Sequence, residues 1–157
     1  MRHPGGYRIV DEPAPAALEQ LIVNPAWPLL ASMFAGGWLA YPWFVLNAFA
    51  LGGKRRFADL GIALAGLLLS AASLFSIAWL SATEVLDEQY LPYAQLAPVG
   101  LRLIVFYLLF MRQQQSFGLY TYFGGKPRNA MLVVVAASLL RSQLLASASP
   151  ILQLLFG

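Results

Sequence analysis

Three charged residues stand inside otherwise apolar stretches of the sequence: Asp59, Arg102 and Arg141. A charge within a long apolar stretch is costly to bury, and it is therefore a candidate for function. Asp59 follows the basic run 54–56 by three residues, so about 5 Å of helix separates it from that run. We expect Asp59 to be an interfacial carboxylate near a helix N-terminus, stabilised by the helix dipole and by the basic run.

Arg102 and Arg141 are predicted to lie near the middle of their apolar segments. Ten residues separate Arg102 from Arg112, which is about 15 Å of helix. Arg141 stands about 16 Å into the last segment. No acidic residue stands at a similar depth, so each guanidinium needs another source of solvation. Four sources remain open. Arg102 can snorkel to the outer surface near the acidic residues of 84–88, or both guanidinium groups can bond to helix carbonyls or to Ser and Gln side chains. A partner subunit can supply a carboxylate, or both arginines can line a wet cavity that attracts anions.

A face of small and polar residues runs along the apolar segment 58–80. Its members are Asp59, Ala63, Gly66, Ser70 and Ser73. Their spacing of four, three, four and three residues keeps them on one side of a helix. Small residues let helices approach closely in lipid, so we predict a helix-packing face, with a face that lines a substrate path as the alternative. A similar arc in the last segment consists of Ser138, Ser142, Ala146 and Ser149.

Residues that support catalysis or cofactor binding are scarce in this chain. Cysteine is absent, and the single histidine, His3, lies in a polar tail, which disfavours thiolate and histidine metal sites. The seven acidic residues form no pair within one apolar segment, and the serines of those segments have no neighbouring base to activate them. We therefore predict that the protein is not an enzyme and holds no metal or cofactor.

The composition indicates a membrane protein. Of the 157 residues, 59% are hydrophobic and only 11% are charged, whereas ordinary soluble domains carry about 25% charged residues. A soluble fold of this length needs more polar side chains to cover its surface, but a bilayer removes that need. The net charge of +3 comes from basic residues at the ends of apolar runs. We interpret them as topology signals and expect no nucleic-acid partner.

The elements that must position these residues are apolar helices, and the predicted fold is an all-α integral membrane bundle of about four transmembrane helices. Residues 1–24 form a polar tail, and 25–157 form the membrane domain. Spans are expected near 27–51, 58–80, 96–112 and 130–149, because each approaches the roughly 20 apolar residues that cross a bilayer. The first segment contains Gly36-Gly37 and Pro42. We favour a single crossing by a helix that is kinked at Pro42, and the alternative is a re-entrant hairpin that turns at Gly36–Pro42.

Loop charges predict the orientation of the bundle. The loops 52–57 and 112–129 are basic, and the loop at 84–88 between them is acidic. Basic loops are retained in the cytoplasm, so both are expected there, with 112–129 resting at the lipid headgroups. A single crossing by the first segment then leaves both termini outside, whereas a hairpin leaves the N-terminus in the cytoplasm. The abundance of arginine and alanine indicates a GC-rich bacterial genome, and hence the inner (cytoplasmic) membrane.

Two functions fit this pattern, and no motif selects between them. The first is a noncatalytic subunit, or helix-packing partner, that assembles in the lipid bilayer with itself or with a larger membrane complex. The second is a small oligomeric channel or transporter in which Arg102 and Arg141 attract an anionic solute. Four spans of this size enclose little volume, so transport implies a homo-oligomer.

Overall fold

The structure is a computed structural model that describes residues 18–146, and within that range the chain is helical and forms no strand. Six α-helices and two short 3₁₀ helices follow one another along this part of the chain. Their bounds are η1 Glu19–Leu21, α1 Ala26–Phe34, α2 Gly37–Ala50, α3 Arg56–Ala82, η2 Glu88–Tyr90, α4 Leu91–Ala94, α5 Leu96–Tyr122 and α6 Met131–Ala146.

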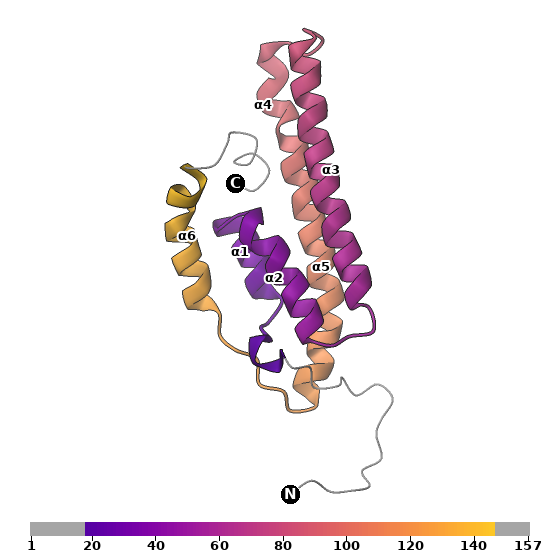
Figure 1. Ribbon diagram of the computed structural model, residues 1–157, viewed down its shortest axis with the longest axis vertical. Helices are drawn as coiled ribbons and strands as arrows, with labels where there is room; N and C mark the ends of the chain where they lie inside the picture. The colour runs from indigo at the N-terminus through magenta and orange to yellow at the C-terminus, as the bar shows by residue number, and fades with distance from the viewer. Residues whose placement is uncertain (1–17, 147–157) are drawn as a thin grey trace, which may run out of the picture.

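The helices α3 and α5 form an antiparallel pair along the long axis of the molecule (Figure 1). Each has 27 residues, or about 40 Å of helix, which exceeds the hydrocarbon thickness of a bilayer. Both are long and apolar enough to cross a membrane, whereas the apolar part of α6, Met131–Gln143, is shorter. By length and composition, the described residues therefore supply two candidate spans, and the predicted count of four is not confirmed.

The first apolar segment folds as a helical hairpin. α1 ends at Phe34, α2 begins at Gly37, and the two helices run side by side in opposite directions (Figure 1). Gly36 joins them with a φ of 102°, which residues other than glycine rarely adopt. At the open end, the backbone N–H of Val23 donates a 3.1 Å hydrogen bond to Oδ1 of Asn47. Both ends of the hairpin therefore lie at one level, and the segment forms two helices that break at Gly36 in place of the single helix, kinked at Pro42, that we favoured.

Neither helix of the hairpin is long enough to cross a bilayer alone. The 9 residues of α1 and the 14 residues of α2 correspond to about 14 Å and 21 Å of helix. A turn was predicted within Gly36–Pro42. The structure places it at the first residue of that interval, and Pro42 lies inside α2. We call the turn formed by 34–37 the hairpin tip, and it lies beside α5, part of the way along that helix (Figure 1).

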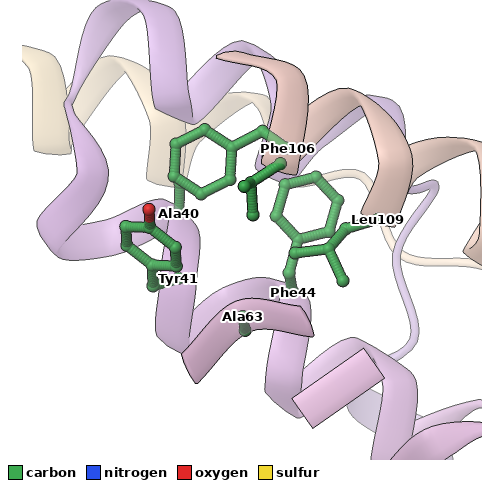
Figure 2. Close-up of a cluster of buried hydrophobic side chains, with 7 residues drawn as sticks. Ala40, Tyr41, Phe44, Ala63, Phe106 and Leu109 are labelled. Atoms are coloured by element: carbon green, nitrogen blue, oxygen red, sulfur yellow. The ribbon is translucent and has the colours of Figure 1, made fainter. Parts of the chain in front are cut away.

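The core forms where α2 packs against α3 and α5 (Figure 2). Phe44 and Phe106 are buried and stack with their ring centroids 5.8 Å apart, and Tyr41 lies 4.6 Å from Phe106. Small residues admit this close packing. A Cβ built on Gly66 of α3 would lie 2.5 Å from Cγ1 of Val105 of α5, so the two long helices approach to a distance that only glycine allows there.

The helix α5 is longer than the predicted span 96–112. The segment expected to be the first part of a loop, 112–122, is helical. Its buried residues Gln113, Phe117 and Tyr120 are spaced four and three residues apart, so one side of α5 stays packed against the protein. Phe117 and Tyr120 pack with Ile22 and with the end of α2. Only 123–130 remain as a connection, so the predicted loop 112–129 was wrong over most of its length.

The helix α6 runs parallel to α1 and is joined to it at both ends (Figure 1). At the lower end, the backbone N–H of Arg128 donates a 2.9 Å hydrogen bond to the carbonyl of Ile22, within an isolated bridge between Val23 and Arg128. At the upper end, Arg141 reaches the last turn of α1. The predicted fourth span, 130–149, extends past Ala146, so its end lies outside the described residues. Ser149, the last member of the predicted arc, also lies outside them.

Candidate functional site

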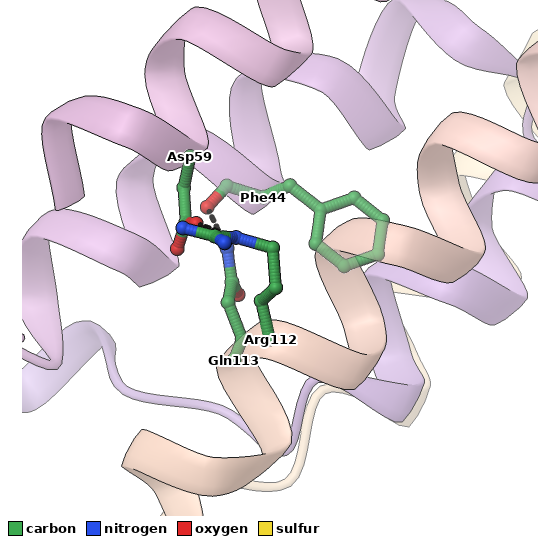
Figure 3. Close-up of polar contacts among 4 residues, drawn as sticks. All are labelled: Phe44, Asp59, Arg112 and Gln113. Carbon is green, nitrogen blue, oxygen red and sulfur yellow. Dashed lines mark hydrogen bonds and ion pairs between the residues drawn. The ribbon is translucent and has the colours of Figure 1, made fainter. Parts of the chain in front are cut away.

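The polar side chains of the fold gather at two levels, which we describe in turn. The lower level lies at the open end of the hairpin, where Asp59 of α3 meets Arg112 of α5 (Figure 3). Nε of Arg112 donates a 2.7 Å hydrogen bond to Oδ1 of Asp59. Asp59 lies in the first turn of α3, close to the helix N-terminus as expected, but it is buried. Its ion-pair partner was not predicted, because the sequence pointed to the basic run 54–56.

Asn47 and Gln113 form the rest of the lower level. Each side chain is only 1% exposed. Nδ2 of Asn47 donates to Oε1 of Gln113 at 3.0 Å. Nε2 of Gln113 donates to the carbonyl of Phe44 at 2.8 Å, as Figure 3 shows. With the bond from Val23 to Asn47, this network joins the entrance of α1, the end of α2 and the middle of α5.

Neither of these two amides was predicted from the sequence. Asn47 is the only non-aromatic polar side chain in the second half of the first apolar segment, and Gln113 begins the pattern of buried residues that continues along the rest of α5. Both signals are present in the sequence. They become informative only once α5 is known to continue through the polar run that follows Arg112.

The upper level is the hairpin tip. Arg102 and Arg141, the two arginines that stand inside apolar segments of the sequence, both lie there. Nη1 of Arg141 donates a 3.3 Å hydrogen bond to the carbonyl of Phe34, the last residue of α1. Arg102 reaches the same turn from α5, since its Cδ would lie 3.6 Å from a Cβ built on Gly37. The bond from Arg141 is one of the four sources of solvation that the sequence left open. A guanidinium also suits this place because the C-terminal end of a helix carries a partial negative charge.

Tyr41 adds a third polar group to the upper level. It is 6% exposed, and its hydroxyl lies near the side chain of Ser70 but makes no hydrogen bond of good geometry within the described part of the chain. The Arg102 guanidinium interacts electrostatically with Tyr41 and with the like charge of Arg141. Two cations and one buried hydroxyl group thus surround the turn between α1 and α2.

The predicted packing face of α3 points into the protein. Asp59, Ala63, Gly66 and Ser70 are the buried residues of this helix, and Ser73 is partly buried. The hydroxyl of Ser70 donates to the carbonyl of Gly66 at 2.8 Å, and that of Ser73 donates to the carbonyl of Ser70 at 2.9 Å. Both hydroxyl groups bond within their own helix, so this face brings α3 close to α5 and α2.

The arc predicted for the last segment is not a buried face. Ser138 is partly buried and donates to the carbonyl of Val134 at 2.7 Å, whereas Ser142 and Ala146 are exposed. The side chains that α6 buries are Val134 and Ala137. Of the predicted arc, only Ser138 therefore lies on the side of α6 that packs against the protein.

The chemistry available at both levels is hydrogen bonding and charge, from guanidinium, amide and hydroxyl groups. Among the described residues, no three acidic or histidine side chains stand close enough together to hold a metal ion. No protein-family model, no curated protein and no solved structure matches this chain.

Proposed function

We propose that this chain is a noncatalytic polytopic subunit of a bacterial inner-membrane assembly. In this arrangement α3, α5 and α6 cross the bilayer, and the α1–α2 hairpin enters it and returns on the same side. The hairpin's short helices are permissible in lipid because they are flanked by the longer α5 and α6, and non-spanning backbone at membrane depth has to be covered by protein.

The observation that carries this proposal is how the polar side chains between the helices are used. Asp59 bonds to Arg112, and Asn47 bonds to Gln113. Arg141 bonds to the backbone of the hairpin tip. Each of these contacts joins two different elements of the same chain. Polar groups used in this way hold helices together and are not available to a substrate, as expected of a structural subunit.

The charge distribution supports the orientation. The exposed basic residues Arg55, Arg56, Lys126 and Arg128 all lie where the hairpin opens and α5 ends. The acidic residues Glu84 and Asp87 lie in the opposite connection, between α3 and η2. Under the positive-inside rule, the end that carries the basic residues faces the cytoplasm. The chain then also enters the hairpin from the cytoplasmic side, because both ends of the hairpin are at that level.

An exposed apolar surface supports self-assembly. α3 and α5 extend beyond the hairpin, and among the described helices only α4 packs beside them there (Figure 1). On this part of α3, Phe75 is 74% exposed and Trp79 is 60% exposed. We propose that a second copy covers this surface. The aromatic side chains give it contact area, and Ser76, exposed between them, permits close approach of a helix.

Cross-linking in the native membrane tests the assembly. The chain contains no cysteine, so Phe75→Cys and Leu132→Cys each introduce a single thiol, the first on the proposed interface and the second on the exposed side of α6. We expect oxidation to link Phe75→Cys into dimers and to leave Leu132→Cys monomeric. Equal cross-linking of both variants, or monomers in both the membrane and a mild detergent, would contradict self-assembly.

A small anion channel or transporter is the second candidate, favoured by the two arginines at the hairpin tip. Rings or pairs of cationic side chains select anions in membrane pores, and discontinuous helices form binding sites at mid-membrane depth. Replacement of Arg102 or Arg141 by Leu separates the two functions. A conduction role predicts that anion flux into liposomes falls while assembly is retained, whereas a structural role predicts that assembly and expression change together.

A further inference from the structure

An apolar groove runs between α1 and α6. Its volume is about 330 Å³, and it is lined by Trp27, Leu30 and Phe34 of α1 and by Met131, Val135 and Leu139 of α6. On each helix these residues recur at spacings of three or four, so they form one continuous strip along about 12 Å of helix. Ser138 is the polar residue of the lining, and its hydroxyl already donates to the carbonyl of Val134.

The two helices are held on either side of this groove by contacts at its ends. The bridge between Val23 and Arg128 joins the segments that enter α1 and α6. The bond from Arg141 to the carbonyl of Phe34 joins the helices again at the hairpin tip. These contacts link the helices at both ends of the groove, and its apolar lining suits a lipid chain or another apolar group.

The lower end of the groove is positively charged. Lys126 and Arg128 are exposed in the connection that leads into α6, and Arg128 is fixed to the entrance of α1 by its backbone hydrogen bond to Ile22. α1 and α6 both begin at this end, so their dipoles add positive potential there. Basic pockets beside membrane helices on the cytoplasmic side bind acidic lipid headgroups.

We propose that this groove is a binding site for one acidic phospholipid, with an acyl chain between α1 and α6 and the headgroup phosphate beside Lys126 and Arg128. The apolar strip matches the acyl chain in chemistry, and the basic end matches the headgroup in charge. The proposal depends on the membrane location proposed above. It adds a specific ligand, and it gives the α1–α6 pair a role that neither self-assembly nor conduction explains.

Native mass spectrometry of the full chain in detergent tests the site, with phosphatidylglycerol and phosphatidylcholine as probes. We expect one phosphatidylglycerol to remain bound to each chain and phosphatidylcholine to be lost. Val135→Phe fills the groove and should abolish binding. Val133→Phe adds the same ring to an exposed side of α6 that does not line the groove, and it should bind lipid as the unchanged chain does.

A charge variant tests the headgroup contact without altering the interior. Lys126→Gln combined with Arg128→Gln should weaken phosphatidylglycerol binding by about thirtyfold and remove the preference over phosphatidylcholine. Arg55→Gln, which removes an exposed charge at the same level but far from α6, is the control. Both substituted side chains of the charge variant are exposed, so folding is preserved even if Val135→Phe does not fold.

Three outcomes would overturn the site: equal binding of both lipids, unchanged binding by a folded Val135→Phe variant, and disulfide formation between two copies of Val135→Cys, which would show that a second chain occupies the groove. Failure of the membrane location is distinguishable from these. In that case the chain would be recovered from the aqueous fraction of broken cells without detergent, whatever lipid it binds.

Discussion

Several polar side chains in this protein join parts of the chain that are distant in sequence. Gln113 bonds to both Asn47 and the carbonyl of Phe44, and it is almost completely shielded from solvent. Arg141 bonds to a carbonyl 107 residues away. Within an apolar interior an unpaired polar group is costly, so such bonds specify one arrangement of the helices more sharply than apolar contacts do.

Substitution of Gln113 tests this at the level of one residue. Gln113→Leu keeps the side-chain volume similar but leaves Nδ2 of Asn47 and the carbonyl of Phe44 without their partner. We expect the free energy of unfolding to fall by about 2–4 kcal/mol, since two buried polar groups lose a hydrogen bond. Unfolding in mixed detergent micelles measures it. Gln114→Leu, at the exposed neighbouring position, should change the stability by less than about 0.5 kcal/mol.

For a single residue, the sequence predicts how far along its helix the residue lies. It does not predict which side chain on another helix the residue bonds to. The similar depth expected for Arg102 and Arg141 agrees with their meeting at one turn, because helical rise alone determines depth. The partner of Asp59 depends on where α5 passes α3. That crossing is a property of the packed bundle, so the neighbouring basic run 54–56 was chosen in place of Arg112.

At the scale of elements, glycine and small residues determine how the helices pack. The spacing along α3 predicted which of its sides is buried, because helical periodicity is local. The break after α1 was harder to predict. Gly36-Gly37 signals a turn, but the uncharged run on both sides fits a continuous helix equally well. The choice between them depends on the packing of α1 against α2, which the sequence does not show.

A pair of glycines in α3 tests the packing directly. The Cβ of Gly66→Ala would meet both γ-carbons of Val105, whereas a Cβ on Gly61 has nothing within 4 Å. We expect Gly66→Ala to destabilise the fold by about 1–3 kcal/mol through overpacking, and Gly61→Ala to be neutral or stabilising because alanine favours the helix. Thermal unfolding in detergent, followed by circular dichroism, measures both.

The origin of the Gly66→Ala effect is testable in the same background. If the clash with Val105 is the cause, Val105→Ala should restore part of the stability lost in Gly66→Ala. A Gly66→Ala variant as stable as Gly61→Ala would show instead that α3 and α5 do not approach closely at this point.

At the scale of the whole molecule, the hairpin determines the topology of the chain. If the hairpin enters and leaves the bilayer on one side, the N-terminal segment lies on the same side as both basic connections. If the first segment crosses once, the N-terminal segment lies opposite them. Loop charges alone could not choose between these arrangements, because they orient α3, α5 and α6 identically in both.

Single cysteines decide between these topologies. Gln20→Cys, Arg55→Cys and Asp87→Cys introduce exposed thiols before α1, before α3 and after α3. In sealed inverted membrane vesicles, which display the cytoplasmic face, we expect a membrane-impermeant maleimide to label Gln20→Cys and Arg55→Cys and to label Asp87→Cys only after detergent is added. Labelling of Arg55→Cys without Gln20→Cys would place the N-terminal segment across the bilayer. The hairpin would then have to open in the membrane, and the bond between Val23 and Asn47 that closes it could not persist.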